Sequence, residues 1–128
     1  MNPLLLDSHA LVWWFEDHPR LSPLALQAIE EQADQVLVSA ASVMEIEVKR
    51  LKGKLTAPDD VLAQVEDAGF RLLDITPDNA LDAARLPRHH GDPFDRLLIA
   101  QAQAEAATLV TDDEAITAYD VPTMRARG

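Results

Sequence analysis

Acidic side chains stand at four places along the chain where apolar runs end or helical patterns begin. If those runs are parallel strands, their carboxyl ends meet at one edge of a sheet, where ligands bind in open α/β folds. Acids that are remote in the sequence would then lie close together. Carboxylate oxygens are the ligands that Mg²⁺ and Mn²⁺ prefer, and such ions promote the hydrolysis of phosphodiesters. The acids concerned are Asp7, Glu45, Asp92, Asp95, Asp112 and Asp113.

Helix capping offers a simpler explanation for each acid taken alone. Asp7 fits the N-cap of a first helix, and Asp92 precedes Pro93, an arrangement typical of a helix start. Ser42 and Glu45 have the spacing of a capping box. For any single acid, capping is therefore the favoured explanation.

The set of acids exceeds what capping needs. One acceptor caps a helix, yet Asp92 is followed by Asp95, and Asp112 by Asp113. Two unit charges about 4 Å apart repel by roughly 4 kcal/mol at an effective dielectric of 20, so these groups require cations. The chain has no cysteine and no His-x-x-x-His pair, which disfavours a zinc site. We therefore expect one or two hard divalent ions, Mg²⁺ or Mn²⁺.

The elements that must position these acids alternate between strand and helix. Apolar residues at helical spacing predict helices near 9–15, 21–29, 43–51, 56–68, 76–86 and 92–107, with Thr56 and Thr76 as the caps of two of them. Short apolar runs predict strands at 4–6, 36–38, 70–73 and 109–110, with Val121 in a last edge strand. This alternation predicts an α/β fold whose parallel sheet is covered on both faces. The length of 128 residues predicts one domain, residues 1–128, with a frayed tail at 124–128.

The composition limits what the chain can bind. Lys and Arg number 11 against 22 Asp and Glu, which gives a net charge of −11. This excess of acidic residues argues against broad nonspecific nucleic-acid binding, because phosphate affinity comes mainly from Lys and Arg.

The lack of cysteine excludes a disulfide framework and cysteine catalysis. No apolar run reaches the roughly 20 residues of a membrane span, and no basic region precedes the first apolar run, so a cytoplasmic location without membrane contact is expected.

Four segments, taken in order, resemble those of PIN-domain ribonucleases, and in particular VapC-type toxins of toxin–antitoxin pairs. They reach from near the start of the chain to near its end, and the segment from Asp92 is the most specific. The resemblance implies a three-layer α/β/α sandwich, an acidic quartet that binds Mg²⁺ or Mn²⁺, and hydrolysis of RNA phosphodiester bonds. The segments are Leu4–His9, Ser42–Ile46, Asp92–Ala100 and Leu109–Asp113.

The resemblance also implies a role for each acid of the quartet. Asp7, Glu45 and Asp95 match its first three members. Asp113 matches the fourth, as the last residue of a Thr-x-Asp pattern whose supporting hydroxyl is Thr111. Asp7 and Asp95 would be the principal metal ligands. Glu45 and Asp113 would complete the catalytic set, directly or through water.

Basic residues near these segments are candidates for substrate binding. The segment 49–54 holds four of the 11 basic residues, and it either complements a helix C-terminus or contacts phosphate. Lys49 and Lys52 are our candidates there, together with Thr111. For Arg96, pairing with an acid is slightly favoured over contact with phosphate.

Several other residues have open roles. Asp92 and Asp112 fit either caps or auxiliary ligands. His89 and His90 are expected in a solvent-exposed loop, but that loop leads into Asp92, which leaves a role beside the scissile phosphate open.

The aromatic run 13–15 (Trp13, Trp14 and Phe15) cannot be buried whole on one helix, because neighbouring side chains point about 100° apart. At least one ring should be partly exposed, as is common at partner surfaces. The resemblance implies two such surfaces, one for a homodimer and one for an antitoxin.

Two divalent ions would cancel the four charges of the quartet, and the protein would remain acidic. We therefore expect weak RNA binding without metal, and a basic antitoxin segment as partner.

Two alternatives stand beside the ribonuclease. A receiver-type phosphoacceptor domain has a similar length and acids at strand ends. Against it, the acid at position 7 is single, and no Lys follows 109–110 in the expected place. A catalytically silent PIN-like fold would serve only as a protein-binding module, although all four acids of the quartet are present.

Overall fold

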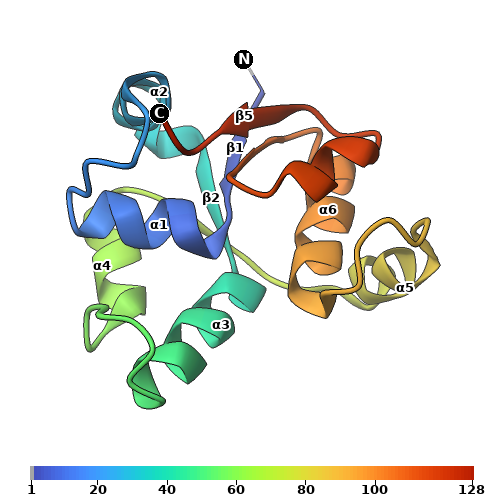
Figure 1. Ribbon diagram of the computed structural model, residues 1–128, viewed down its shortest axis with the longest axis horizontal. Coiled ribbons are helices and arrows are strands. Elements are labelled where there is room, and N and C mark those ends of the chain that lie inside the picture. The colour runs from blue at the N-terminus through green and yellow to red at the C-terminus, as the bar shows by residue number, and fades with distance from the viewer. Residues whose placement is uncertain (1) are drawn as a thin grey trace.

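A five-stranded parallel sheet forms the centre of the molecule (Figure 1). The computed structural model describes residues 2–128. The strands lie in the order β3-β2-β1-β4-β5, and every neighbouring pair is parallel. They are β1 (Leu4–Leu6), β2 (Val36–Ser39), β3 (Arg71–Leu73), β4 (Thr108–Thr111) and β5 (Thr123–Arg125).

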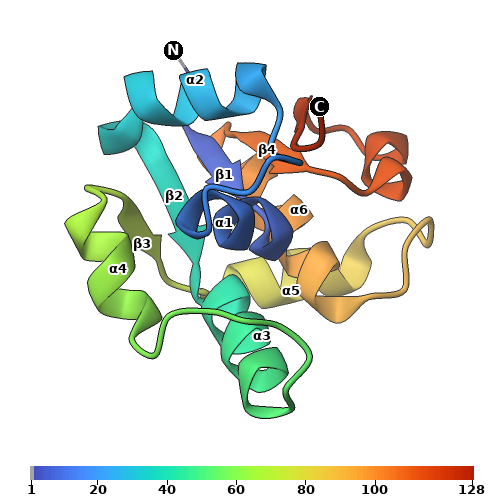
Figure 2. The same ribbon diagram turned by 60° about the vertical axis from the view of Figure 1, so that its left-hand side comes forward.

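Helices cover both faces of this sheet (Figure 2), so the three-layer α/β/α sandwich is confirmed. The helices are α1 (Ser8–Phe15), α2 (Pro23–Glu31), α3 (Ala40–Leu51), α4 (Val61–Asp67), α5 (Pro77–Arg85) and α6 (Pro93–Glu105), with short 3₁₀ turns η1 (Ala33–Gln35) and η2 (Glu114–Ala118). α1, α2 and α4 pack on one face, whereas α6 and η2 pack on the other. Within residues 2–128, no helix combines the length and the apolar character that crossing a membrane requires.

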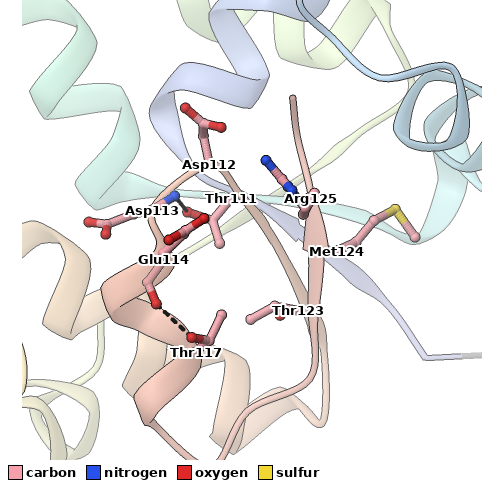
Figure 3. Close-up of a pocket in the computed structure, with 8 residues that line it drawn as sticks. All are labelled: Thr111, Asp112, Asp113, Glu114, Thr117, Thr123, Met124 and Arg125. Carbon is pink, nitrogen blue, oxygen red and sulfur yellow. Dashed lines mark hydrogen bonds between the residues drawn. The ribbon is translucent and has the colours of Figure 1, made fainter. Parts of the chain in front are cut away.

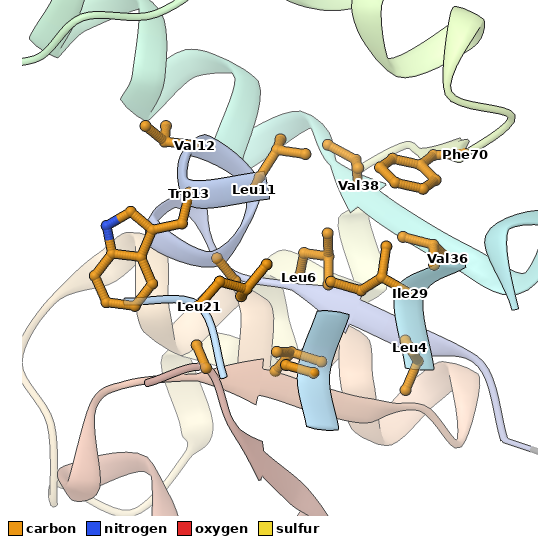
Figure 4. Close-up of a cluster of buried hydrophobic side chains, with 14 of the residues drawn as sticks. Leu4, Leu6, Leu11, Val12, Trp13, Leu21, Ile29, Val36, Val38 and Phe70 are labelled. Atoms are coloured by element: carbon orange, nitrogen blue, oxygen red, sulfur yellow. The ribbon is translucent and has the colours of Figure 1, made fainter. Parts of the chain in front are cut away.

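Side chains along β1 divide the core between the two faces. Leu4 and Leu6 belong to a cluster with residues of α1, α2 and β2 (Figure 4). Leu5 packs with Leu98 and Leu109 on the opposite face. All three β1 side chains are buried, because a central strand of a covered parallel sheet has no solvent-facing side. This burial fixes the carboxyl end of β1.

The strand order places a crevice at that end of β1. The chain leaves β1 towards β2 on one side and later returns to β4 on the other side. Ligands bind to open α/β sheets at such a switch of direction. Asp7 follows β1 and Asp112 follows β4, so these two acids flank the crevice.

The aromatic run 13–15 is partly exposed, as predicted. Trp13 is only 8% exposed, whereas Trp14 and Phe15 are half-buried against the same core cluster. The ring centroids of Trp14 and Phe70 are 4.9 Å apart. Trp14 therefore contributes to packing as well as to the surface.

The C-terminal residues pack against the rest of the protein, so the prediction of a frayed tail is wrong. Ala126 is fully buried, and the Ser22 N–H donates to its carbonyl at 2.7 Å. The Gly128 N–H donates to Arg20 O at 3.1 Å. These partners lie about 100 positions earlier in the chain, where no local pattern can reveal them. The last strand, β5, also begins later than predicted. Val121 lies before it and packs on the core.

Two helices are capped by residues other than those the sequence suggests. Ser39 caps α3 by accepting a backbone N–H at 3.0 Å, so this helix begins before the predicted cap Ser42, which is buried within it. Asp60, rather than Thr56, caps α4. The predicted caps Asp7, Thr76 and Asp92 are confirmed.

Candidate metal centre

The structure brings all six acids together in one hollow of about 280 Å³ at the crevice beside β1. They come from the end of β1, from α3, from the start of α6 and from the loop after β4. Four segments that are distant in the sequence therefore meet at one place. The hollow is lined by Asp7, Ser8, His9, Glu45, Lys49, Asp92, Asp95, Asp112 and Asp113.

Asp7 caps a helix and also faces the hollow. Its Oδ1 accepts the Ala10 N–H at 2.8 Å, which caps α1. The residue is 5% exposed. Burial raises the pKa of this carboxyl, although the hydrogen bond from Ala10 acts in the opposite direction. The cap and ligand explanations of Asp7 are compatible, because a carboxylate has two oxygens.

Glu45 lines the hollow from α3, which begins earlier than the sequence suggests. With Ser39 as the cap, Glu45 lies in the second turn, so the predicted capping box with Ser42 is wrong. Ser8 Oγ donates to Glu45 Oε1 at 2.6 Å, and Lys49 Nζ donates to Oε2 at 3.1 Å. Both oxygens are thus oriented by neighbours. No pattern in the sequence indicates the part played by Ser8 beyond its place next to the first acid.

Asp92 is the N-cap of α6 and places Asp95 at the hollow one turn later. Asp92 Oδ1 accepts two backbone N–H groups of the first turn, at 2.8 and 3.4 Å. The Asp95 side chain is 20% exposed. Burial, and next the charge of Asp92, raise the pKa of Asp95 to about 7, although His90 opposes this. Such a shift indicates a carboxyl that is removed from solvent and lies beside another negative charge.

Two local hydrogen bonds orient Asp113 after β4. Thr111 Oγ1 accepts the Asp113 N–H at 3.1 Å. Asp113 Oδ1 accepts the Ala115 N–H at 2.9 Å and caps η2, while Oδ2 faces His90. Burial acts to raise the pKa of Asp113, but the hydrogen bonds from His90 and Ala115 outweigh it and lower the pKa.

His90 lies inside the site, so its assignment to a solvent-exposed loop is wrong, whereas His89 is exposed as expected. His90 Nε2 is 2.6 Å from Asp113 Oδ2 and 3.0 Å from Asp95 Oδ2. Burial disfavours the charged imidazole, but the hydrogen bond to Asp113 and the charge of Asp95 raise the pKa of His90. The one signal in the sequence was that its loop leads directly into α6.

Arg96 stabilises the loop before α6, and none of its hydrogen bonds within residues 2–128 goes to an acid. It donates to Tyr119 Oη at 3.4 Å. Tyr119 Oη in turn accepts the N–H groups of His89 and His90, at 3.1 and 2.8 Å. The guanidinium also donates, over 2.8–3.3 Å, to the carbonyls of Ala84, Leu86, Pro87 and His90. The slightly favoured pairing of Arg96 with an acid is therefore wrong, because loop carbonyls take its donors.

The docked tail supplies a cation at the rim of the hollow. Arg127 pairs with Asp112 at 3.0 Å, and its guanidinium carbon lies 5.7 Å from the Trp13 ring centroid. Among the basic candidates, Lys49 lines the hollow, whereas Lys52 is exposed and lies outside its lining.

The donor set fits a hard divalent cation. The side chains that converge are mainly carboxylates, which suit Mg²⁺ and Mn²⁺. The raised pKa values of Asp7 and Asp95 reflect carboxyls whose charge lacks full compensation, and a divalent ion would supply it.

A second hollow of about 270 Å³ adjoins the acids, between η2 and β5 (Figure 3). It shares Asp112 and Asp113 with the first hollow. Thr117, Thr123 and Arg125 belong to its wall. A groove with hydroxyl groups and a guanidinium thus leads to the acidic centre.

Comparison with known proteins agrees with this fold. The PIN domain family matches residues 4–122. Ribonuclease VapC22 of Mycobacterium tuberculosis (strain ATCC 25618 / H37Rv) is 36% identical over 125 residues, which cover 95% of each chain.

Solved structures share the fold at lower identity. DNA-bound VapBC from Salmonella typhimurium superposes with a TM-score of 0.70 and 19% identity, covering 97% of this chain and 98% of that chain. A toxin–antitoxin complex from Klebsiella pneumoniae gives a TM-score of 0.68 and 20% identity, covering 96% and 97%. Since the family match spans most of the chain and the Mycobacterium relative aligns over nearly all of it, the chain belongs to the PIN domain family.

Proposed function

We propose that this protein is a metal-dependent endoribonuclease that acts as the toxin of a toxin–antitoxin pair. The observation that carries the proposal is the convergence of Asp7, Glu45, Asp95 and Asp113 in one hollow at the carboxyl edge of the sheet. The 36% identical relative is named a ribonuclease, which supports the same activity here.

Asp7 and Asp95 are the principal ligands in this proposal, and Glu45 and Asp113 complete the set directly or through water. The ion would be Mg²⁺ or Mn²⁺. When bound, it activates water and neutralises charge during phosphodiester hydrolysis. Ser8 orients the Glu45 side chain through a hydrogen bond of 2.6 Å, and Thr111 accepts the backbone N–H of Asp113 at 3.1 Å.

The second hollow is the proposed path of the RNA backbone towards the acids. Arg125 and the hydroxyl of Thr123 offer donors to phosphate and sugar oxygens, whereas the Thr117 hydroxyl donates to Glu114 O at 2.6 Å (Figure 3). Lys49 lies in the metal hollow itself. Lys52 is exposed, so we assign it a weaker, salt-sensitive contact with phosphate.

An antitoxin is the proposed protein partner, and the chain is proposed to form a homodimer in the cytoplasm. The related solved structures include toxin–antitoxin complexes, which supports an antitoxin partner. The net charge of −11 favours a partner segment rich in Arg or Lys.

Membership of the PIN domain family argues against the receiver-type alternative. A silent PIN-fold module would keep the fold and lack cleavage, so an activity assay separates it from the proposed nuclease.

The test compares RNA cleavage in Mg²⁺ or Mn²⁺ by the unaltered protein and by Asp7→Asn and Asp95→Asn variants. Asp34→Asn is the matched control, because Asp34 is exposed in η1, just before β2, at the opposite end of the sheet. We expect cleavage by the unaltered protein and the control, and a loss of at least about 100-fold in the other two. Equal cleavage by all four proteins, or by none, would reject the proposal.

A further inference from the structure

We propose, on the basis of the ribonuclease function, that two adjoining hollows between α5 and α6 form a subsite for one nucleotide of the RNA. One hollow holds a phosphate of the strand, and the other holds the base of the same nucleotide. Both lie at the loop that joins the two helices (Figure 1). The nucleotide bound there is a neighbour of the scissile phosphate along the strand.

The first hollow has a volume of about 350 Å³ and carries two arginines, Arg88 and Arg96, in its wall. None of its described lining residues is an acid. Neither arginine takes part in an ion pair within residues 2–128. Two uncompensated guanidinium groups are unexpected in a chain whose net charge is −11. Together they favour an anion in this hollow, and phosphate suits guanidinium donors best.

The two arginines have different parts in this subsite. Arg96 donates to four backbone carbonyls and to the Tyr119 hydroxyl, all of which are neutral. Its terminal nitrogens are therefore occupied, while its positive charge remains. Arg88 is exposed, so its guanidinium is accessible to a ligand. Arg88 makes the direct contact with phosphate, and Arg96 adds a fixed positive charge from the wall.

The second hollow is apolar and has a volume of about 420 Å³. Ala80, Ala83, Pro93 and Leu97 form most of its wall. It also shares Ala84, Gly91 and Arg96 with the first hollow, so the two are continuous. A nucleobase has apolar faces that pack on apolar side chains and on guanidinium planes. A phosphate and its own base could thus occupy the two hollows together.

The position of the first hollow links it to the metal centre. His90 belongs to its wall. The Nε2 atom of the same ring is 3.0 Å from Asp95 Oδ2 and 2.6 Å from Asp113 Oδ2. One imidazole ring therefore separates the hollow from the acids, whatever the charge of that ring. This proximity favours a nucleotide over a protein side chain as the occupant, because the RNA strand must also reach the acids.

The test uses a short RNA that the protein cuts at one mapped bond, together with analogues that each lack one group. In one series a methylphosphonate removes the charge of a single phosphate beside the cut. In the other series an abasic unit removes a single base. Cleavage by the unaltered protein is measured in Mn²⁺. We expect one neutral phosphate to raise KM by roughly 5- to 10-fold, and loss of the base of the same nucleotide to have a similar effect.

Two variants assign these effects to the two hollows. Arg88→Met should raise KM for the unmodified RNA by the same factor and leave kcat unchanged, and the neutral phosphate should then add little. Ala80→Leu fills the apolar hollow, so it should reproduce the effect of the missing base, and the abasic RNA should then lose little more. Both residues are exposed, so the fold should remain.

Matched controls carry the same substitutions outside the two hollows. Arg85→Met changes an exposed arginine in the last turn of α5. Ala104→Leu changes an exposed alanine of α6. Both controls should cleave the unmodified RNA with the KM of the unaltered protein. Both should also respond to the modified RNAs as that protein does.

Several results would overturn the subsite and leave the ribonuclease standing. These are a KM for Arg88→Met or Ala80→Leu that equals the KM of its control, fully additive losses, or unaltered cleavage of every modified RNA by the parent. An Ala80→Leu protein that changes its oligomeric state and keeps its KM would assign the apolar hollow to a second copy of the chain, and would also overturn it. Failure of the unaltered protein to cut RNA would overturn both. The modified RNAs need only the unaltered protein, so they decide even if a variant does not fold.

Discussion

Ser8 and Glu45 lie 37 positions apart in the sequence, yet Ser8 Oγ donates to Glu45 Oε1 at 2.6 Å. Ser8 is the first residue of α1 and directly follows the Asp7 cap, whereas Glu45 lies on α3. The bond therefore joins two helices at the metal hollow and fixes the position of Glu45 relative to Asp7.

Ser8→Ala should lower kcat/KM for RNA cleavage by roughly 10-fold, because a hydrogen bond to a charged group contributes about 1.5–3 kcal/mol. The fold should remain, since only one hydroxyl is lost. The variant is measured beside Glu45→Gln and the double variant. If Ser8 acts through Glu45, the second substitution adds little to the first. Fully additive losses would contradict this.

Lys49→Met and Lys52→Met should have different effects, although the two lysines are neighbours in the sequence. Lys49 binds Glu45 at 3.1 Å, so its loss should lower kcat by roughly 10-fold. Lys52 is exposed outside the hollow, so its loss should raise KM by about 2- to 3-fold, and only at low salt. Steady-state kinetics at two salt concentrations separates the cases. The same kinetic change in both variants would be evidence against separate roles.

Local patterns were sufficient to predict the layers, four strands and the convergence of the acids. Alternation of apolar runs with helical spacing identifies β1, β2, β3 and β4, and parallel pairing brings their carboxyl ends to one edge. At Asp7 the sequence allows a helix cap or a metal ligand, and the structure shows that the cap uses one oxygen of a residue that also lines the hollow.

Features that depend on tertiary contacts were missed. Ser39 and Ser42 are both good caps by type, and only the end of β2 decides that Ser39 is used. The sequence places His90 in a loop. The contact that holds its backbone near the acids comes from Tyr119, 29 positions later. Arg96 next to an acid suggests an ion pair, but loop carbonyls take its donors instead.

The metal-free protein should lose stability as the pH rises, because of Asp95. The pKa of this carboxyl is about 7 in the folded protein, against an ordinary value of 3.8. Between these values the folded state keeps a proton that the unfolded state has lost, so stability falls from about pH 4 to about pH 7. The free energy of unfolding of Asp95→Asn should therefore exceed that of the parent by roughly 1–3 kcal/mol near pH 8, but not near pH 4.

Denaturant unfolding in a chelator, at several pH values, measures this difference. The raised pKa of His90 also removes stability as the pH rises, and the charge of Asp95 contributes to that shift. The comparison between the two proteins therefore measures Asp95 together with its coupling to His90. Added Mg²⁺ should stabilise the parent at high pH more than the variant. A variant that is less stable than the metal-free parent near pH 8 would contradict the assignment.

Removal of the last three residues should destabilise the protein, although they follow the last strand. A chain that ends at Arg125 loses the buried Ala126 and the bond that its carbonyl accepts from Ser22. It also loses the Arg127 pair with Asp112. We expect a loss of roughly 1–3 kcal/mol, seen as a lower Tm.

Arg127→Met separates the two parts of this effect. The variant keeps the docked backbone, so its Tm should fall only slightly, because a half-exposed ion pair contributes about 0–1 kcal/mol. It also leaves Asp112 without its cation, so Mn²⁺ should bind the hollow more tightly than in the parent. Equal Tm values for the shortened chain and the parent would mean that the tail does not stabilise the fold. Weaker Mn²⁺ binding in Arg127→Met would mean that Arg127 does not compete with the metal for Asp112.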